Sequence, residues 1–161
     1  MDPRPAGLTA CDTPVDEASA MMSTPDDASP PTRAQAAEAA DLLRNICRGF
    51  PEVTERLSHG SITFFIRDNR VLCYLSDDHH GDGRLAVIYP APAGVQAELV
   101  AAEPERFFRP PYVGHRGWVG LRLDVDPDVD EVAGILHEAY RQVAPKKLVE
   151  QLDATTGIRE P

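Results

Sequence analysis

The run DDHHGDG at residues 77–83 gathers acidic and histidine side chains, which are residue types that bind metal ions. Carboxylates and imidazoles are good ligands for zinc or nickel. Ligands that are adjacent on one turn seldom converge on a single ion without help from elsewhere in the chain. We therefore expect a solvated turn between two strands at this place, and no metal site.

A second cluster with chemical potential is His115-Arg116, which lies between Tyr112 and Trp118 in the sequence. A histidine titrates near neutral pH, and together with an arginine it could grip an anion. This would need a concave pocket. The alternative is structural: Tyr112 would anchor the loop against a sheet, and Trp118 would be a large packing residue at the start of a strand.

Catalytic patterns are poor. Ser58 and His59 are neighbours in sequence, which does not create a nucleophile–base pair, and there is no GxSxG and no glycine-rich phosphate loop. Cys11, Cys47 and Cys73 form no CxxC pair, so the chain fits a reducing cytoplasm, where the last two are expected to be small core residues. We expect no enzymatic activity and no cofactor.

The net charge of −10 over 161 residues is concentrated at the two ends of the chain. Residues 61–123 are electrically balanced and contain seven arginines and no lysine. Proteins that bind phosphate backbones tightly usually carry a basic excess, which this chain lacks, although arginine can fork and stack as lysine cannot. No apolar run approaches the ~20 residues of a membrane-spanning helix. We expect no membrane association.

The chain divides into an acidic, proline-rich tail at residues 1–31 and one domain at residues 32–161. The tail holds six of the 15 prolines and no Ile, Phe, Trp or Tyr. Such a segment cannot bury enough apolar surface to offset its ordering entropy, so we expect it to be disordered.

Periodicity and capping residues predict the elements of the domain. A helix begins after Thr32, whose capping box uses Gln35. A later helix begins at Asp126-Pro127, or at Asp128 with Glu131 three residues on. The remaining expected elements are strands at residues 61–67, 70–75, 84–89, 106–109 and 116–124, and short helices at 93–102 and 146–152. The order α-β-β-β-α-β-β-α indicates an α+β fold with two layers, in which helices cover one face of an antiparallel sheet.

Alternation along the strands assigns side chains to the two faces of the sheet. One face is apolar apart from Cys73 and Tyr89. The other face is expected to collect aromatic and arginine side chains, with Leu72 among them: Phe65, Tyr74 and Trp118 together with Arg67, Arg70, Arg84 and Arg122. Aromatic rings can stack bases while arginines neutralise phosphates. In the alternative, arginine stems cover the rings, or a partner chain closes the face.

The stretch PPYVGHRGWVGLRLD at residues 110–124, followed by Ala139-Tyr140-Arg141 and by APKKL at residues 144–148, resembles the MmcQ/YjbR family. The resemblance covers roughly residues 33–153. It implies a small α+β protein with a fold like that of secretion chaperones, described as DNA-binding through a double-wing motif. It carries no catalytic residue set.

These observations together predict a non-enzymatic binding protein. Phe65, Tyr74 and Trp118 would stack bases, and the residues expected to contact phosphates are Arg67, Arg70, Arg116 and Arg122. Tyr112 and His115 complete the candidate surface. The alternative is a protein-binding domain or a homodimer with no role in nucleic-acid binding.

Overall fold

The computed structural model describes residues 30–78 and 83–156. Nearly all of the expected tail, and both histidines of the polar turn at residues 77–83, lie outside the described residues. Within the described part, no helix is long and apolar enough to cross a membrane.

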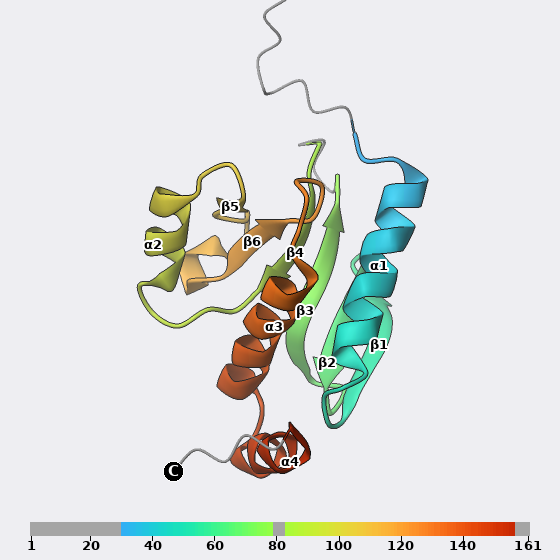
Figure 1. Ribbon diagram of the computed structural model, residues 1–161, viewed down its shortest axis with the longest axis vertical. Coiled ribbons are helices and arrows are strands. Elements are labelled where there is room, and N and C mark those ends of the chain that lie inside the picture. Colours follow the sequence, from blue (N-terminus) through green and yellow to red (C-terminus); the bar gives the residue numbers. More distant parts are fainter. Residues whose placement is uncertain (1–29, 79–82, 157–161) are drawn as a thin grey trace, which may run out of the picture.

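Six antiparallel strands form one sheet in the order β1-β2-β3-β4-β6-β5. The strands are β1 (Val53–Ser58), β2 (Ser61–Ile66), β3 (Arg70–Asp77), β4 (Leu85–Tyr89), β5 (Phe107–Phe108) and β6 (Val119–Arg122). The β2–β3 hairpin turns through residues 67–69, between the strands expected at residues 61–67 and 70–75. Figure 1 shows β1 at one edge of the sheet, and β5 occupies the other edge.

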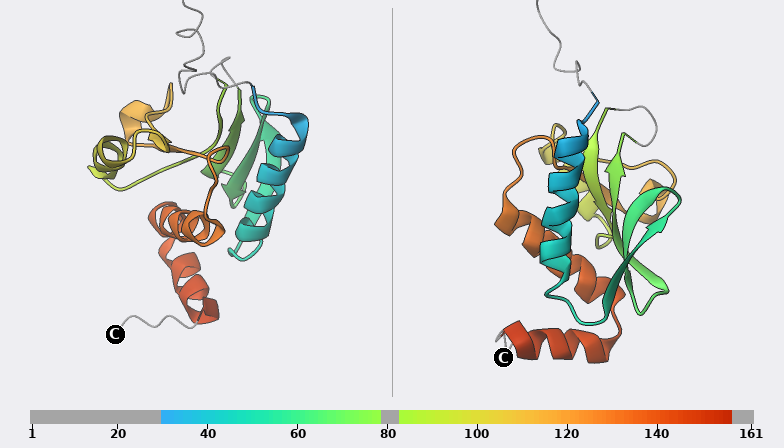
Figure 2. Two further views of the ribbon diagram at one scale, coloured as in Figure 1. Left: turned by 45° about the horizontal axis from the view of Figure 1, so that its top comes forward. Right: turned by 90° about the vertical axis from the view of Figure 1, so that its right-hand side faces the viewer.

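Four α-helices cover one side of this sheet. They are α1 (Arg33–Cys47), α2 (Val95–Ala102), α3 (Val129–Val143) and α4 (Lys146–Thr156), and a short 3-10 helix, η2 (Gly114–Arg116), precedes β6. Figures 1 and 2 show α1 and α3 packed in front of the strands. Leu43 of α1, Leu136 of α3 and Leu152 of α4 join the apolar sheet residues in one large buried cluster. The α+β fold with helices on one face is therefore confirmed.

The helix starts follow from local chemistry. Thr32 accepts a hydrogen bond from the backbone N–H of Gln35, and the Gln35 side chain accepts one from the backbone N–H of Thr32. Asp128 accepts hydrogen bonds from the backbone N–H groups of Asp130 and Glu131 at the start of α3. Both caps satisfy donors that have no partner within the helix.

The predicted order lacked one strand, β1. Its residues VTERLS have no wholly apolar face, because Glu55 alternates with Val53 and Leu57. Edge strands have a single neighbour and tolerate such polar patterns. The final helix also continues to Thr156, beyond the predicted end at Leu152.

A β-bulge corrects three of the face assignments, because Val71, expected on the apolar face, lies opposite Phe65, and Arg70 and Leu72 change to the helix side. The register between β2 and β3 shifts between Phe64 and Phe65, so Val71 pairs with Phe65 and Arg70 pairs with Ile66. A bulge inserts one residue and reverses the alternation beyond it. Leu72 is therefore fully buried under the helices. Arg70, expected on the aromatic face, lies on the helix side and donates from Nη1 to the carbonyl oxygen of Val143, 2.7 Å away.

A buried tyrosine ties α3 to the loop that follows α1. The Tyr140 hydroxyl donates to the carbonyl oxygen of Pro51 over 2.7 Å, and its ring lies 5.1 Å from the ring of Phe50. Tyr89 differs: its hydroxyl is buried and has no hydrogen-bond partner among the described residues. Burial raises the pKa of both phenols, so both stay protonated near neutral pH.

We expect Tyr140→Phe to lower the free energy of unfolding by about 1–2 kcal/mol, because it removes a hydrogen bond and leaves a carbonyl unsatisfied. Tyr89→Phe, the matched control, should leave stability unchanged or raise it. Urea unfolding followed by Trp118 fluorescence measures both. Equal losses in the two variants would contradict this account.

Candidate nucleic-acid interface

The sheet face turned away from α1 and α3 carries the candidate site, and we call it the open face. Ala86, Ile88 and Phe108 form a small buried cluster there, with Tyr74 and Trp118 packed against it. The residues on this face include Thr54, Arg56, Thr63, Phe65, Val71, Tyr74, Ser76, Arg84, Ala86, Ile88, Phe108, Val113, Trp118, Gly120 and Arg122.

Arg56 covers the first ring of this face. The carbon of its guanidinium lies 3.8 Å from the ring centroid of Phe65, and its Nη2 donates to the carbonyl oxygen of Asp68 over 2.8 Å. Phe65 is consequently buried, and the surface offered above it is a guanidinium plane. The sequence analysis did not find Arg56 because it did not find β1. The alternation of Thr54, Arg56 and Ser58 was the available signal.

Arg84 covers a second ring in the same way. Its guanidinium carbon lies 4.5 Å from the ring centroid of Phe108. The Phe108 ring in turn occupies the space beside Gly120, where a Cβ atom would overlap it. The glycine in β6 is therefore what lets a two-residue edge strand place an aromatic ring flat on the open face.

Tyr74 and Trp118 form the centre of the open face. Their ring centroids are 6.3 Å apart with an interplanar angle of 36°, and both side chains are half-buried. Burial raises the pKa of Tyr74, so its hydroxyl remains a hydrogen-bond donor near neutral pH. Gln96 of α2 fixes this region, since its Nε2 donates to the carbonyl oxygens of Gly114 and Trp118.

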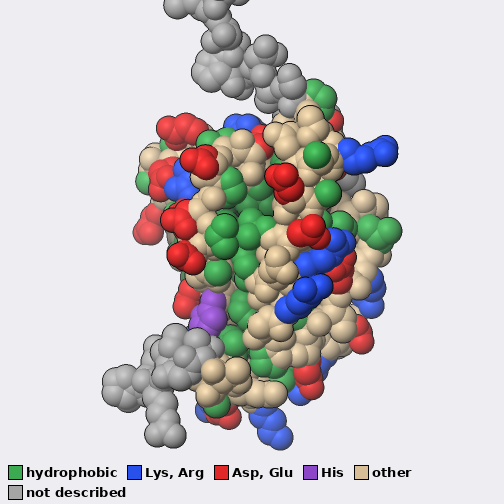
Figure 3. Space-filling model, turned by 45° about the vertical axis from the view of Figure 1, so that its right-hand side comes forward, with side chains coloured by type: hydrophobic (Ala, Val, Ile, Leu, Met, Phe, Trp, Pro, Cys, Tyr) green, Lys and Arg blue, Asp and Glu red, His purple; other side chains and the backbone are tan. Residues whose placement is uncertain are grey.

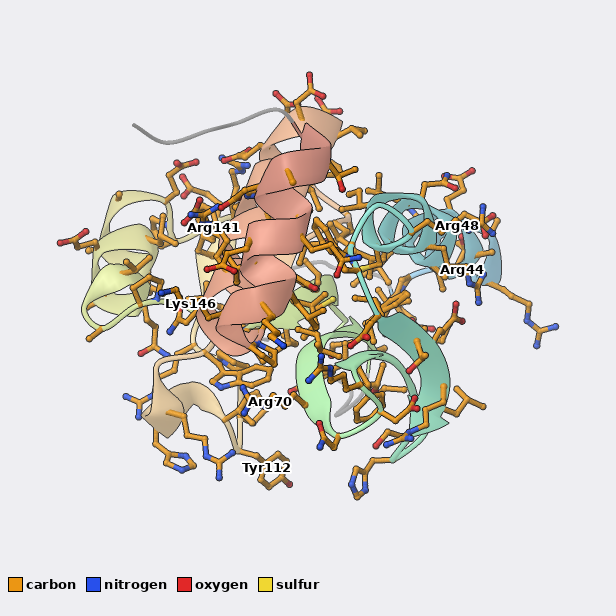
Figure 4. All side chains as sticks on the ribbon, turned by 90° about the horizontal axis from the view of Figure 1, so that it is seen from below. Arg44, Arg48, Arg70, Tyr112, Arg141 and Lys146 are labelled. Atoms are coloured by element: carbon orange, nitrogen blue, oxygen red, sulfur yellow. The ribbon has the colours of Figure 1, made fainter. Side chains whose placement is uncertain are left out.

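The loop before β6 places three predicted residues at the rim. Tyr112 has a left-handed backbone conformation (φ 68°) and is 78% exposed. His115 and Arg116 share η2, and both are exposed. Figure 4 shows Tyr112 on the opposite side of the sheet from α1 and α4. The structure thus brings this loop to the edge of the open face.

Two predicted arginines are engaged elsewhere, and a third is neutralised. Arg67 sits in the β2–β3 turn and forms an ion pair with Glu52. Arg70 lies on the helix side, as described above. Arg122 does face the open side, but it forms two hydrogen bonds with Asp124, of 3.0 and 2.9 Å. A carboxylate so close offsets much of its attraction for a phosphate.

A hollow of about 100 Å³ lies on the helix side, away from the Tyr112 loop. It opens between the end of α1 and β1, and its lining residues are Arg44, Cys47, Arg48, Val53, Thr54, Glu55 and Phe64. Ligand pockets usually measure ~300–1,000 Å³, so the hollow is small for an organic ligand. In the described part of the chain, no three His, Cys, Asp or Glu residues are grouped to hold a metal ion.

We expect Gly120→Ala to destabilise the protein by about 1–3 kcal/mol, because the new methyl group overlaps the Phe108 ring. In a Phe108→Ala background the same Gly120→Ala substitution should cost less, because the overlapping ring is absent. Gly134→Ala on α3 is the control, since nothing lies within 4 Å of its Cβ position, and it should be neutral or stabilising. Chemical unfolding of the unsubstituted chain, the three single variants and the double variant checks this. An undiminished penalty in the Phe108→Ala background would refute the overlap.

Comparisons with known proteins identify the family of the chain. The YjbR family model matches residues 48–142, from the end of α1 to the last turn of α3. The crystal structure of Deinococcus radiodurans protein DR2400, with a DUF419 domain, is similar with a TM-score of 0.56 and 18% identity. The match covers 74% of this chain and 88% of that chain. At this level of identity it shows that the two proteins share a fold. No curated protein matches. The match spans more than half of the chain and includes the loop and strand that carried the resemblance: the chain belongs to the YjbR family.

Proposed function

We propose that the chain is a non-enzymatic binding protein that holds single-stranded DNA on the open face. The observation that carries the proposal is the pair of guanidinium groups lying over rings, Arg56 over Phe65 and Arg84 over Phe108, on the same face as the rings of Tyr74 and Trp118. Guanidinium planes and aromatic rings bind ligands by stacking and charge. They do not supply a base or a nucleophile.

The arrangement favours unpaired bases over a duplex. Phe65 lies on β2, Tyr74 on β3 and Phe108 against β6, so the stacked groups run across the strands of the sheet. Bases of a single strand can stack on rings or guanidinium planes, whereas the bases of a duplex are already stacked on each other. The exposed Arg116 and His115 at the rim would contact the backbone.

The proposed site therefore keeps part of the predicted set and extends it. Tyr74, Trp118, Tyr112, His115, Arg116 and Arg122 remain, and Phe65 supports Arg56 from below. Arg56 is new, and Arg84, which was expected on this face but not in the site, joins it. Arg67 and Arg70 are left out because their side chains are held by Glu52 and by Val143.

Charge sets the expected strength of binding. The net charge of −10 opposes any polyanion at long range, and Figure 3 shows acidic side chains spread over the side that carries α1. Binding at the open face would be local, modest and strongly dependent on salt. Cys47 and Cys73 are both buried free thiols, which is in keeping with the cytoplasm, the place we propose for the protein.

The test is a titration of the full chain with short single-stranded and double-stranded DNA, followed by fluorescence. Trp118 is the only tryptophan, so its emission reports the open face directly. We expect the single strand to quench Trp118 and to bind more tightly than the duplex. Affinity should fall as salt rises, with a logarithmic slope of about −0.7 for each phosphate contacted.

Arg84→Gln should weaken binding of the single strand several-fold and reduce the salt slope. Arg33→Gln is the matched control, because Arg33 is an exposed residue at the start of α1, on the other side of the sheet. No binding at low salt, or equal losses from the two variants, would reject the proposal. The open face would then be considered as a surface for another protein.

A further inference from the structure

The exposed edge of the sheet carries an inference that is independent of the proposed function. β1 is six residues long and pairs with β2 alone. The backbone N–H of Arg67 donates to the carbonyl oxygen of Glu52, which fixes the phase of the ladder. In an antiparallel ladder every second residue bonds inward. Val53, Glu55 and Leu57 therefore point their N–H and C=O groups outward, away from β2.

The charged side chains of β1 are held within the chain and do not prevent another strand from pairing with this edge. Charges on an edge strand usually prevent pairing with another chain. Here Glu55 accepts three hydrogen bonds from Arg44, which together with Arg48 lowers the pKa of Glu55, and Arg56 is held over Phe65. Leu57 remains 72% exposed, and Val129, the other large aliphatic residue exposed in the described part of the chain, is 54% exposed.

The hollow beside β1 provides a place for such a leucine. Val53, Cys47 and Phe64 supply its apolar lining, and Arg44 and Arg48 also line it. Figure 4 shows Arg44 of α1 and Arg48, the residue after its end, in one region, apart from the other labelled side chains. Val53 and Leu57 both lie on the helix side of β1, two residues on either side of Glu55.

We propose that β1 pairs with β1 of a second copy of this chain, antiparallel and about a two-fold axis through Glu55. In this register each Leu57 lies directly opposite Val53 of the other copy, at the mouth of the hollow, so an exposed leucine fills a cavity on each side. The outward backbone groups of Val53, Glu55 and Leu57 all find partners. The two Glu55 carboxylates meet, each already neutralised by Arg44, and Arg48 gains a second acidic neighbour.

The self-complementary register is the reason for naming a second copy as the partner. Antiparallel pairing that keeps the helix layers on one side allows only even register shifts. A shift of two residues sets Leu57 opposite Glu55 in one direction and opposite Pro51 in the other, and both leave Val53 without its leucine. A two-fold axis makes the contact closed, so the assembly stops at a dimer. The opposite edge cannot compete, because β5 has two residues. The dimer has a continuous sheet of twelve strands with both open faces on one side.

The decisive experiment is cysteine cross-linking of the full chain in a Cys11→Ser, Cys47→Ala background, because the Cys47 thiol lines the hollow that Leu57 is proposed to enter. A Val53→Cys protein and a Leu57→Cys protein are oxidised separately and as a mixture. The Cα atoms of two directly opposed, hydrogen-bonded residues on antiparallel strands lie ~5.5 Å apart, which is within the Cα–Cα range of a disulfide. The mixture should therefore form cross-linked dimers several-fold faster than either protein alone, because neither position lies opposite itself.

Sedimentation across a range of protein concentrations provides the second readout. The unsubstituted chain should show a monomer–dimer equilibrium, Leu57→Ser should shift it to monomer, and Val129→Ser should leave it unchanged. Circular dichroism confirms that each variant is folded. A monomer at every concentration, or cross-linking that is equally fast in the mixture and in the separate solutions, would overturn the proposal. The edge would then be open to a strand of a different protein.

Discussion

The helices of this protein form a single layer, and a single layer can bury only one face of a sheet. Leu43, Leu136 and Leu152 come from three different helices and all reach the same face, where the large cluster forms. The opposite face still carries rings and aliphatic groups that water solvates poorly. Neighbouring arginines cover two of these rings: the guanidinium of Arg56 lies over Phe65, and that of Arg84 lies over Phe108. Each guanidinium shields a ring from water and stays hydrated on its outer side.

This arrangement gives the open face its chemical character. A guanidinium over a ring contributes about 0.5–1 kcal/mol at an exposed site, which is small enough for a ligand to compete or to add to the stack. The backbone at Trp118 has a further support, since Gln96 of α2 donates to the carbonyl oxygens of Gly114, at the start of η2, and of Trp118, after its end. A helix on one side of the sheet thus positions a loop that reaches the other side. The face combines adaptable arginines with a fixed aromatic centre.

The two edges of the sheet are treated differently. β5 is reduced to two residues, one of which turns its ring onto the face while Phe107 is buried under the helices. β1 is long, and its central charges are used within the chain. The short β5 leaves little backbone for pairing, whereas the regular β1 could pair with a further strand. Such pairing would not change the open face.

Local chemistry alone determined several parts of the structure. The caps at Thr32 and Asp128 require only neighbouring residues, and strands with a clean two-residue alternation, such as β4, showed their faces in the sequence. The residues around Trp118 indicated the family. Tertiary structure decided the rest. The bulge at Phe64–Phe65 places Arg70 and Leu72 on the helix side. The central acidic side chain of β1, Glu55, is paired because Arg44 of α1 lies beside it. Neither could be seen in the sequence, since both depend on which residues far along the chain are brought opposite each other, and a pattern of neighbours carries no information about that pairing.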